Sequence, residues 1–569
     1  MDKKTLPLVV LLVIAIVFYG QILQFLGLVE PPTEPPQTTT ASSDSSRPAV
    51  AEQAPELPAA TSVTRPSPER LAAPADQPLD SVACDTIVVI TNNYEVTLCS
   101  FGGGPISLKL KDYTYRDGRM IEMLPDAEAA TPEASFAGGA FSTGRLPFTC
   151  NLGPGRYDAT DDTLELVYTY DNGSGGQLHR TLRFYPDTYH YDLTLDLIGI
   201  RSLGLDGPYR LTWNTPLAVT EPQPQTDYEA MEAVTMLGGA RESIDDFNDG
   251  RLSQTMDGSS AWVGVRQKYF AAVLIPRRET KSVFADGVKE KISTPGGSIE
   301  ARRITAGMVL DFAGVESLSD TVTVFVGPMD YLLMSDYNVG LEDMLDIGTT
   351  PIVGWIIKLF AIAIIWLLPR MYDVVPNYGL VIILFALLVK IVTLPLSMKS
   401  FKSMAAMREL QPKMEELKVK HKKNPQALNQ EMMRLYKKHG VNPISGCLPM
   451  LPQMPLFFAL FSVFRSTILL RDAPFVWFIT DLSIGASSLT DPYILLVVLM
   501  VVAQFLSQKL TMPSTQQNKM IGYIMPLFFG FIFYKFAAGL VLYWICFSAF
   551  SLLDYVLFKR PKNTDVETA

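Results

Sequence analysis

Residues 377–398 read NYGLVIILFALLVKIVTLPLSM, an apolar run broken by a single charged residue, Lys390. About 20 apolar residues, rising 1.5 Å each in a helix, cover the roughly 30 Å core of a bilayer, so the run predicts a membrane-spanning helix. A charge at membrane depth costs about 2.5 kcal/mol or more and usually faces a wet cavity or a partner. A lysine can instead snorkel toward a polar helix end such as Ser397–Lys399. Both interpretations stay open on this stretch alone.

The composition of the chain is typical of a membrane protein with a soluble part. The 569 residues have a positive mean hydropathy, only 19% are charged, and the apolar residues are clustered. The net charge is −10, yet residues 397–441 hold 11 Lys/Arg against 4 Asp/Glu, which gives +7 and leaves −17 for the rest. Such a basic island suits anionic lipid headgroups or RNA better than an acidic substrate pocket.

The N-terminal 81 residues divide into an anchor and a tether. Lys3 and Lys4 precede an apolar run from Leu6 to Val29 without an obvious small-x-small cleavage site, so residues 1–29 predict an uncleaved transmembrane anchor with its N-terminus in the cytoplasm. Residues 30–81 are rich in Pro, Ser, Thr and Ala. They predict a disordered linker, because this composition cannot bury a core.

Residues 82–346 predict a large antiparallel β-sandwich domain. Short runs of period-two alternation, such as TLELVYTYDNG (163–173) and DTVTVFVGP (320–328), are separated by Gly, Asn and Asp. Residues 330–346 predict a helix that leads out of the sandwich. His179 and His190 lie in strands without a nucleophile or carboxylate pattern around them, which favours structural roles.

The five cysteines indicate neither a metal site nor a redox motif, because no C-x-x-C or zinc spacing occurs. Cys84 and Cys99 flank a predicted turn at Asn92-Asn93. They could pair in an oxidising compartment, but the spacing leaves this open. We expect no cofactor.

Residues 351–376 contain GWIIKLFAIAIIWLLPRMYDVVP, which is nearly long enough to span. Lys358 lies inside this run, Pro369-Arg370 ends it, and the next span begins almost at once. We therefore expect an amphipathic helix at the membrane surface, with a true span as the alternative.

The basic island predicts a helical hairpin over residues 397–441. Its first helix covers 397–423, and Asn424-Pro425 then provides a cap followed by Pro at N1 of a second helix that ends at Gly440. Apolar stripes run along both helices. In the first they comprise Met404, Met407, Leu410, Met414 and Leu417. The stripes either pack on each other or form a soft surface for varied apolar helices.

Four further spans follow, over residues 444–468, 492–510, 520–536 and 540–558, and the last two form a tight hairpin. Gln453 lies within the first of them and Gln504 on a polar face of the second. The Lys/Arg counts place both termini in the cytoplasm, with Arg471 and Lys535 as exceptions in the outer loops. The fold class is therefore a multi-domain membrane protein with six spans, a β-sandwich and a cytoplasmic hairpin, ending in a short tail over 559–569.

Three ordered stretches resemble the YidC membrane protein insertases, in the form that carries a large periplasmic domain. They are NQEMMRLYKKHGVNPISGCLPMLPQMPLFFALF (429–461), LRDAPFVWFITDLS (470–483) with DPYIL (491–495), and GLVLYWICFS (539–548). The resemblance covers nearly the whole chain. It implies a membrane chaperone that inserts and folds other membrane proteins in the inner membrane, alone or with the SecYEG translocon and its accessory subunits.

The resemblance also implies a five-span core, residues 377–558, around a water-filled groove that holds one cation. The family usually has arginine where this chain has Lys390, and often threonine where it has Ala386. Lysine keeps the charge but loses the planar fork. The resemblance assigns Gln453, Tyr543, Trp544 and Ser548 to the groove or its support, and Gln504 completes the predicted set.

The expected partners are nascent membrane proteins, anionic lipids and, through the 397–441 hairpin, the ribosome; no specific nucleic acid is expected. The predicted cytoplasmic contacts are Met404, Met407, Lys413, Met414, Lys422 and Lys423. No G-x-x-x-x-G-K-[ST] loop occurs, so we expect no ATP chemistry and no enzyme. Two rival classes are a secondary transporter, for which no inverted repeat is seen, and an anchored carbohydrate-active protein, for which no carboxylate pair stands out.

Overall fold

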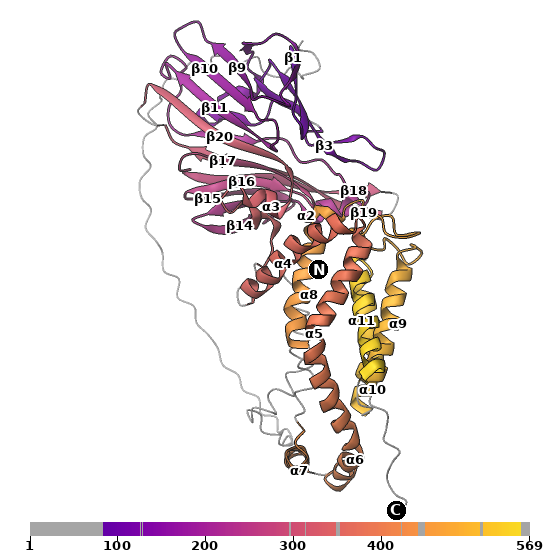
Figure 1. The fold of residues 1–569 in the computed structure, drawn as a ribbon. Coiled ribbons are helices and arrows are strands. Elements are labelled where there is room, and N and C mark those ends of the chain that lie inside the picture. The colour runs from indigo at the N-terminus through magenta and orange to yellow at the C-terminus, as the bar shows by residue number, and fades with distance from the viewer. Residues whose placement is uncertain are drawn as a thin grey trace, which may run out of the picture. The chain divides into compact units, whose positions relative to one another are not determined.

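A computed structural model describes residues 84–558, apart from 126, 128, 295–296, 313–314, 349–352, 423, 442–449 and 512–515. The predicted anchor over 1–29, the linker over 30–81 and the tail over 559–569 lie outside the described residues. Residues 86–328 form three β-sheets, and an α-helical part follows them (Figure 1).

The largest sheet has nine strands in the order β14-β13-β16-β17-β20-β11-β10-β9-β7, and its pairs are antiparallel. Figure 1 shows most of these strands side by side. Strand β17 (FAAVLIP) is buried along nearly its whole length and lies in the interior of the sheet, between β16 and β20. The strands are β7 (Thr149–Cys150), β9 (Leu164–Asp171), β10 (Gln177–Phe184), β11 (His190–Ile198), β13 (Glu232–Leu237), β14 (Ala240–Ile244), β16 (Ser260–Arg266), β17 (Phe270–Pro276) and β20 (Ser317–Pro328).

A six-stranded sheet packs against this one and completes a sandwich. Its order is β15-β18-β19-β12-β5-β6; β18 and β19 contact β16, and β12 contacts β17. Trp213 and Trp262 are fully buried in the shared core. The strands are β5 (Glu133–Phe136), β6 (Phe141–Ser142), β12 (Tyr209–Trp213), β15 (Arg251–Asp257), β18 (Ser282–Thr294) and β19 (Gly297–Leu310).

A smaller third sheet, β4-β3-β2-β1-β8, departs from the expected all-antiparallel pattern. Strands β1 and β2 form the predicted hairpin, but β1 also pairs in parallel with β8. Cys84 and Cys99 form a disulfide, which decides the pairing that the spacing left open. The strands are β1 (Thr86–Ile90), β2 (Tyr94–Cys99), β3 (Gly104–Thr114), β4 (Met120–Glu122) and β8 (Gly155–Asp158).

The prediction of one continuous helix over 330–346 is wrong, because the structure has two short helices there. The structure has α3 (Tyr331–Ser335), capped by the Asp330 carboxylate, and a separate 3-10 helix η4 (Leu341–Leu345). Asn338 and Gly340 between them adopt positive φ angles of 55° and 71°. This left-handed backbone conformation cannot continue a right-handed helix.

The helical part consists mainly of long helices (Figure 1). The sequences of α4, α5 and α8–α11 are predominantly apolar, and those of α6 and α7 are polar. α11 packs against α5, α8 and α9, α4 packs against α5 and α8, and α10 packs against α9. The helices are α4 (Gly354–Val374), α5 (Tyr378–Glu409), α6 (Gln411–Lys420), α7 (Pro425–Lys438), α8 (Met450–Ser466), α9 (Ile494–Thr511), α10 (Gln516–Phe533) and α11 (Ala538–Phe558).

The first helix of the basic hairpin differs from the prediction. The apolar run 377–398 continues as α5 through Glu409, and α6 begins after a break at Leu410. Pro412 explains the break, since it lacks the N–H that would continue the helical hydrogen bonds and its ring clashes with the carbonyl four residues earlier, whereas proline is tolerated in the first turn of a new helix. The second helix is confirmed: Asn424 Oδ1 accepts from the Ala427 N–H (3.1 Å), and Gly440 has a φ of 64° just after the helix.

One buried carboxyl in the β-domain makes its stability depend on pH. Asp227, in α2 (Pro224–Ala230), accepts from the backbone N–H groups of Thr220 (2.6 Å) and Glu221 (2.9 Å). Burial, followed by the Glu221 charge, raises the pKa of Asp227 to about 6. The folded state thus binds this proton more strongly than the unfolded state, so stability rises as the pH falls through 6.

We expect the β-domain to gain about 1 kcal/mol between pH 7 and pH 5 from this group. Amide hydrogen exchange of the core strands β16 and β17 in the full chain measures the gain. Asp227→Asn should remove it, whereas Glu229→Gln, an exposed carboxyl of the same helix, should leave it unchanged. An equal gain in wild type and Asp227→Asn would contradict the assignment.

Candidate functional site

Lys390 lies inside the helix bundle and not on its outer surface. Its side chain is 6% exposed, whereas the neighbouring Ile391 and Val392 are 58% and 71% exposed. Successive residues of a helix point about 100° apart, so the two apolar neighbours face outward while the lysine faces α11. The structure therefore favours the buried, partnered interpretation of Lys390 over the snorkelling one.

The ammonium of Lys390 has three partners on α11. Nζ donates to Ser551 Oγ (2.9 Å), lies 3.1 Å from Asp554 Oδ2, and sits 4.9 Å from the centre of the Phe547 ring. The Asp554 side chain is itself only 14% exposed. Lys390 therefore forms an ion pair with Asp554, an acidic partner that the sequence analysis did not name.

The predicted residues Gln504, Trp544 and Ser548 meet at a second polar cluster. Gln504 Oε1, on α9, accepts from Trp544 Nε1 (2.6 Å) and from Ser548 Oγ (3.4 Å), both on α11. One side-chain carbonyl thus satisfies two donors that would otherwise lie unpaired among apolar helices. Tyr543, one residue before Trp544, is fully buried and its hydroxyl accepts from Gln453 Nε2 of α8 at 3.4 Å.

Helical spacing along α11 explains how a single helix serves both clusters. Trp544 and Ser548 are four residues apart and face α9, while Phe547, Ser551 and Asp554 are spaced by four and three and face α5. The structure thus brings all six predicted groove residues to the contacts of α5, α8 and α9 with α11. Sequence reasoning missed Phe547, Ser551 and Asp554.

The basic hairpin is only partly packed on itself. Met414 of α6 is buried, and its sulfur accepts from the Tyr436 hydroxyl of α7 (3.7 Å). Met404 and Met407 lie on the α5 extension and are half-buried, and Met433 of α7 is 40% exposed. Packing therefore accounts for Met414 but leaves other methionines accessible.

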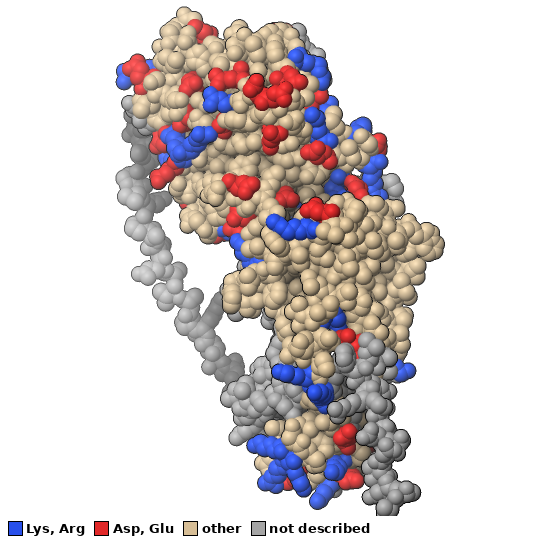
Figure 2. Space-filling model, viewed as in Figure 1, with Lys and Arg blue, Asp and Glu red and all other residues tan. Residues whose placement is uncertain are grey.

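The hairpin lysines face outward. Lys413 and Lys422 are exposed, and Lys413 Nζ lies 3.3 Å from His439 Nε2; Lys423 lies outside the described residues. Figure 2 shows Lys and Arg side chains gathered around this end of the molecule, with a surface almost free of charge over the helices next to it. This distribution is typical of a helix bundle in a bilayer with a basic surface beside it.

At the opposite end of the helices, the loop after α8 docks on the β-domain through a buried ion pair. Arg471 Nε lies 2.7 Å from Glu221 Oε1, and the two side chains are 5% and 2% exposed. Burial alone would lower the pKa of Arg471, but the Glu221 carboxylate raises it above its ordinary value. Arg471 also donates to the Thr114 carbonyl (3.0 Å), and Arg116 pairs with Asp481 of the same loop (3.2 Å).

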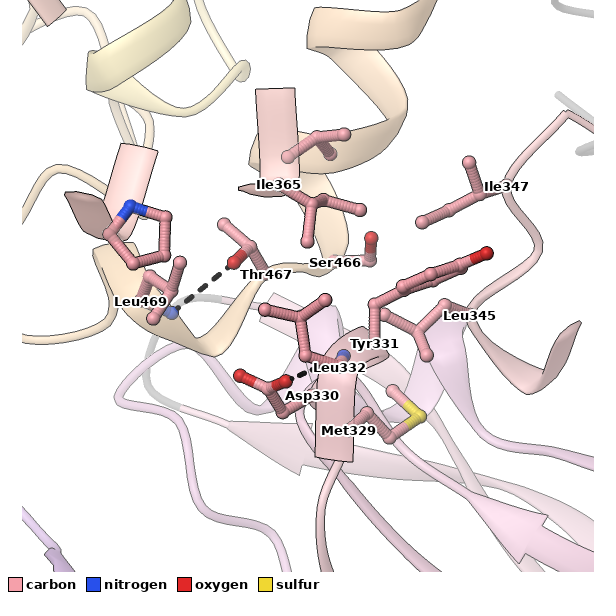
Figure 3. A pocket seen from close by; sticks show the side chains of 12 residues that line it. Met329, Asp330, Tyr331, Leu332, Leu345, Ile347, Ile365, Ser466, Thr467 and Leu469 are labelled. Atoms are coloured by element: carbon pink, nitrogen blue, oxygen red, sulfur yellow. Dashed lines mark hydrogen bonds between the residues drawn. The ribbon is translucent and has the colours of Figure 1, made fainter. Parts of the chain in front are cut away.

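A pocket near this junction contains none of the predicted groove residues (Figure 3). Its polar groups already serve the backbone: Asp330 caps α3 at the Leu332 N–H (2.9 Å), and Thr467 Oγ1 accepts from the Leu469 N–H (3.4 Å). Its other walls are mostly apolar side chains from residues 329–347, with a few from α4, α8 and the residues just after α8. We therefore assign no function to this pocket.

Within the described residues, three helices are long and apolar enough to cross a membrane, over Gly354–Val374, Tyr378–Met407 and Ala538–Tyr555. The shorter apolar helices are Ile494–Lys509 and Ile524–Phe533. The structure describes no group of three or more His, Cys, Asp or Glu side chains in residues 84–558, outside the gaps given above, that could hold a metal ion.

Two protein families match the two parts of the chain. The YidC periplasmic domain family matches residues 86–363, and the 60Kd inner membrane protein family matches residues 370–565. The membrane protein insertase YidC of Chlorobaculum tepidum is 33% identical over 511 residues, which are 86% of this chain and 84% of that protein. The YidC of Chlorobaculum parvum is 32% identical over 509 residues, 86% and 85% of the two chains.

A crystal structure of an active YidC insertase with its first transmembrane domain resolved is 20% identical, with a TM-score of 0.35. The match covers 84% of this chain and 94% of that chain. Both parts of this chain match families of the same protein, and its relatives align over most of their length. The chain therefore belongs to the YidC family.

Proposed function

We propose that this chain is a membrane protein insertase. The observation that carries the proposal is a set of polar side chains on four facing apolar helices, among them the buried ammonium of Lys390. Polar groups within apolar helices are costly, and their usual use is to line a path for polar cargo. The relatives named as insertases support the same function.

In the proposed mechanism, the groove lowers the cost of moving a polar client tail across hydrocarbon. Leaving a peptide group without a hydrogen bond in an apolar medium costs several kcal/mol. Polar side chains such as Gln453, Gln504 and Ser548 would replace part of the lost water. The apolar helix of the client then partitions into lipid, and its hydrophobic transfer drives the process.

The proposed topology has six spans and both termini in the cytoplasm, with the anchor over 1–29 as the first span. The 397–441 hairpin then lies in the cytoplasm, where it would capture clients, contact the ribosome and bind anionic lipids through Lys413, Lys422 and Lys423. Its accessible methionines suit varied apolar helices. Cooperation with the SecYEG translocon belongs to the same proposal.

Helix α4 is proposed to lie at the membrane surface. Trp355, Leu359 and Trp366 are exposed along one face, and Ile357, Ala361 and Leu368 are buried along the other. Lys358 pairs with Asp343 of η4 (2.7 Å), which ties the start of the helix to the β-domain side. The exposed apolar face would contact lipid while the other face packs on α5 and α8, which suits a helix at the membrane surface; a span stays the alternative.

Reconstitution of the full chain in proteoliposomes tests the function. We expect a short single-span client to acquire a protease-protected tail without ATP, and empty liposomes to leave the tail accessible. Ion or substrate flux without client insertion would instead favour a transporter.

Removing residues 86–328 is expected to leave insertion measurable, because all groove residues lie outside the β-domain. A matched variant that keeps the β-domain but carries Lys390→Glu should lose insertion. If the deletion abolished insertion while its helices remained folded, the β-domain would carry the activity. That result would favour an enzyme or binding protein that is merely anchored by the helices.

A further inference from the structure

Asp554 is a charged residue of the groove whose role the family resemblance does not supply. Its carboxylate lies 3.1 Å from Lys390 Nζ, and the two side chains are 14% and 6% exposed. Among the described residues, this ion pair is the one that joins two of the apolar helices α5 and α8–α11. The Phe547 ring and Ser551 complete the surroundings of the ammonium.

The ion pair changes the field that a client meets. A lone ammonium attracts acidic tails and repels basic ones, and the interaction is strong because the site is shielded from bulk water. A carboxylate 3.1 Å away cancels most of that field beyond a few ångströms, since the two charges sum to zero. An acidic tail can then replace Asp554 at Lys390, and a basic tail can replace Lys390 at Asp554.

We propose that Asp554 sets the charge selectivity of the groove: by pairing with Lys390, it makes the groove accept acidic and basic client tails alike. The inference rests on the proposed insertase function. It assigns a specificity-determining role to a residue on the last helix, 164 positions after its partner (554 − 390).

Full-length variants in proteoliposomes test this role with three clients that differ at one tail position, Asp, Asn or Lys. The readout is the ratio of the insertion rates of the Asp and Lys clients, so a general loss of activity cancels. We expect a ratio near one for wild type and at least about tenfold higher for Asp554→Asn, the equivalent of about 1.4 kcal/mol.

Lys390→Gln should lower the ratio below one, because the remaining Asp554 carboxylate favours the Lys client. The double variant Lys390→Gln/Asp554→Asn should return the ratio close to one. Asp373→Asn makes the same chemical change at an exposed residue of α4 and should leave the ratio as in wild type. The swapped pair Lys390→Asp/Asp554→Lys is again neutral, and its ratio should also stay near one. This variant keeps the test decisive if Asp554→Asn fails to fold.

Two outcomes overturn the proposal: an Asp554→Asn ratio within about twofold of wild type, or a swapped pair with a strong preference for either charge. The Asn client distinguishes failure of this inference from failure of the proposed insertase function. If the chain is not an insertase, the wild type does not insert the Asn client. If only this inference is wrong, the wild type inserts the Asn client normally.

Discussion

Lys390→Glu is expected to abolish the insertion of small clients. The change puts a second carboxylate beside Asp554, where the native ammonium lies 3.1 Å from Oδ2 and is hidden from water. The variant loses the attraction of the native pair and adds repulsion between like charges. Breaking a buried pair costs about 3–5 kcal/mol, which corresponds to more than a hundredfold in any step that needs the intact pair.

Lys390→Arg should preserve insertion, because guanidinium keeps the charge and can donate to both Ser551 and Asp554. The measurement is the protease-protected fraction of a short-tailed client in cells depleted of their own insertase. Lys535→Glu, at an exposed lysine between α10 and α11, controls for the charge reversal itself. Full activity of Lys390→Glu at normal protein levels would refute the role of the charge.

The span around Lys390 could be predicted because its evidence is local. An apolar run of 22 residues with one charge predicts a membrane span without reference to any other part of the chain. Period-two alternation likewise predicted the strands β9, β10, β11 and β20 from local sequence alone. Local capping chemistry likewise located α7 between Asn424 and Gly440. One local signal was not used: the predicted first helix of the hairpin ran across Pro412, whereas α5 ends at Glu409 and α6 begins at Gln411.

Asp554 was missed because its meaning depends on a distant partner. Read alone, an acid four residues before the end of the α11 helix at Phe558 looks like an interfacial residue. A signal was nevertheless available. Lys390 lies eight residues and Asp554 four residues from the predicted cytoplasmic ends of their spans at 398 and 558. Both therefore lie in the cytoplasmic half of the predicted spans, where opposite charges are natural partners.

The family pattern also directed attention away from the acid, since it supplies a cation and neutral polar residues for the groove. Ser551 and Phe547 are uninformative in a sequence, because serines and aromatics are common in spans. Their roles appear only when α11 is seen to place residues 547, 551 and 554 toward α5.

Arg471 shows the same dependence on long-range contacts. In the sequence it was an exception to the shortage of cations in the outer loops. The structure explains the exception: Arg471 pairs with Glu221 of the β-domain, 250 residues away, in a site that excludes water. The arginine therefore joins the loop after α8 to the β-domain, and it is the basis of the second large effect we expect.

Arg471→Met is expected to destabilise the junction by about 3–5 kcal/mol, because it leaves the Glu221 carboxylate buried without its partner. Amide hydrogen exchange in the full chain measures the change. The Leu482 N–H donates to the Ala473 carbonyl (3.0 Å) within the docked loop, so its opening free energy reports whether the loop stays in place.

The matched control is Arg119→Met, because Arg119 pairs with Asp117 at 2.7 Å while both side chains stay exposed (76% and 51%). An exposed pair contributes only about 0–1 kcal/mol, so this variant should behave as wild type. The double variant Arg471→Met/Glu221→Leu removes both buried charges and should recover most of the loss, since apolar side chains can fill such a site without a desolvation cost. If the double variant were no more stable than Arg471→Met, the unpaired Glu221 carboxylate would not be the cause, and the packing of the arginine stem against the β-domain would carry the effect instead.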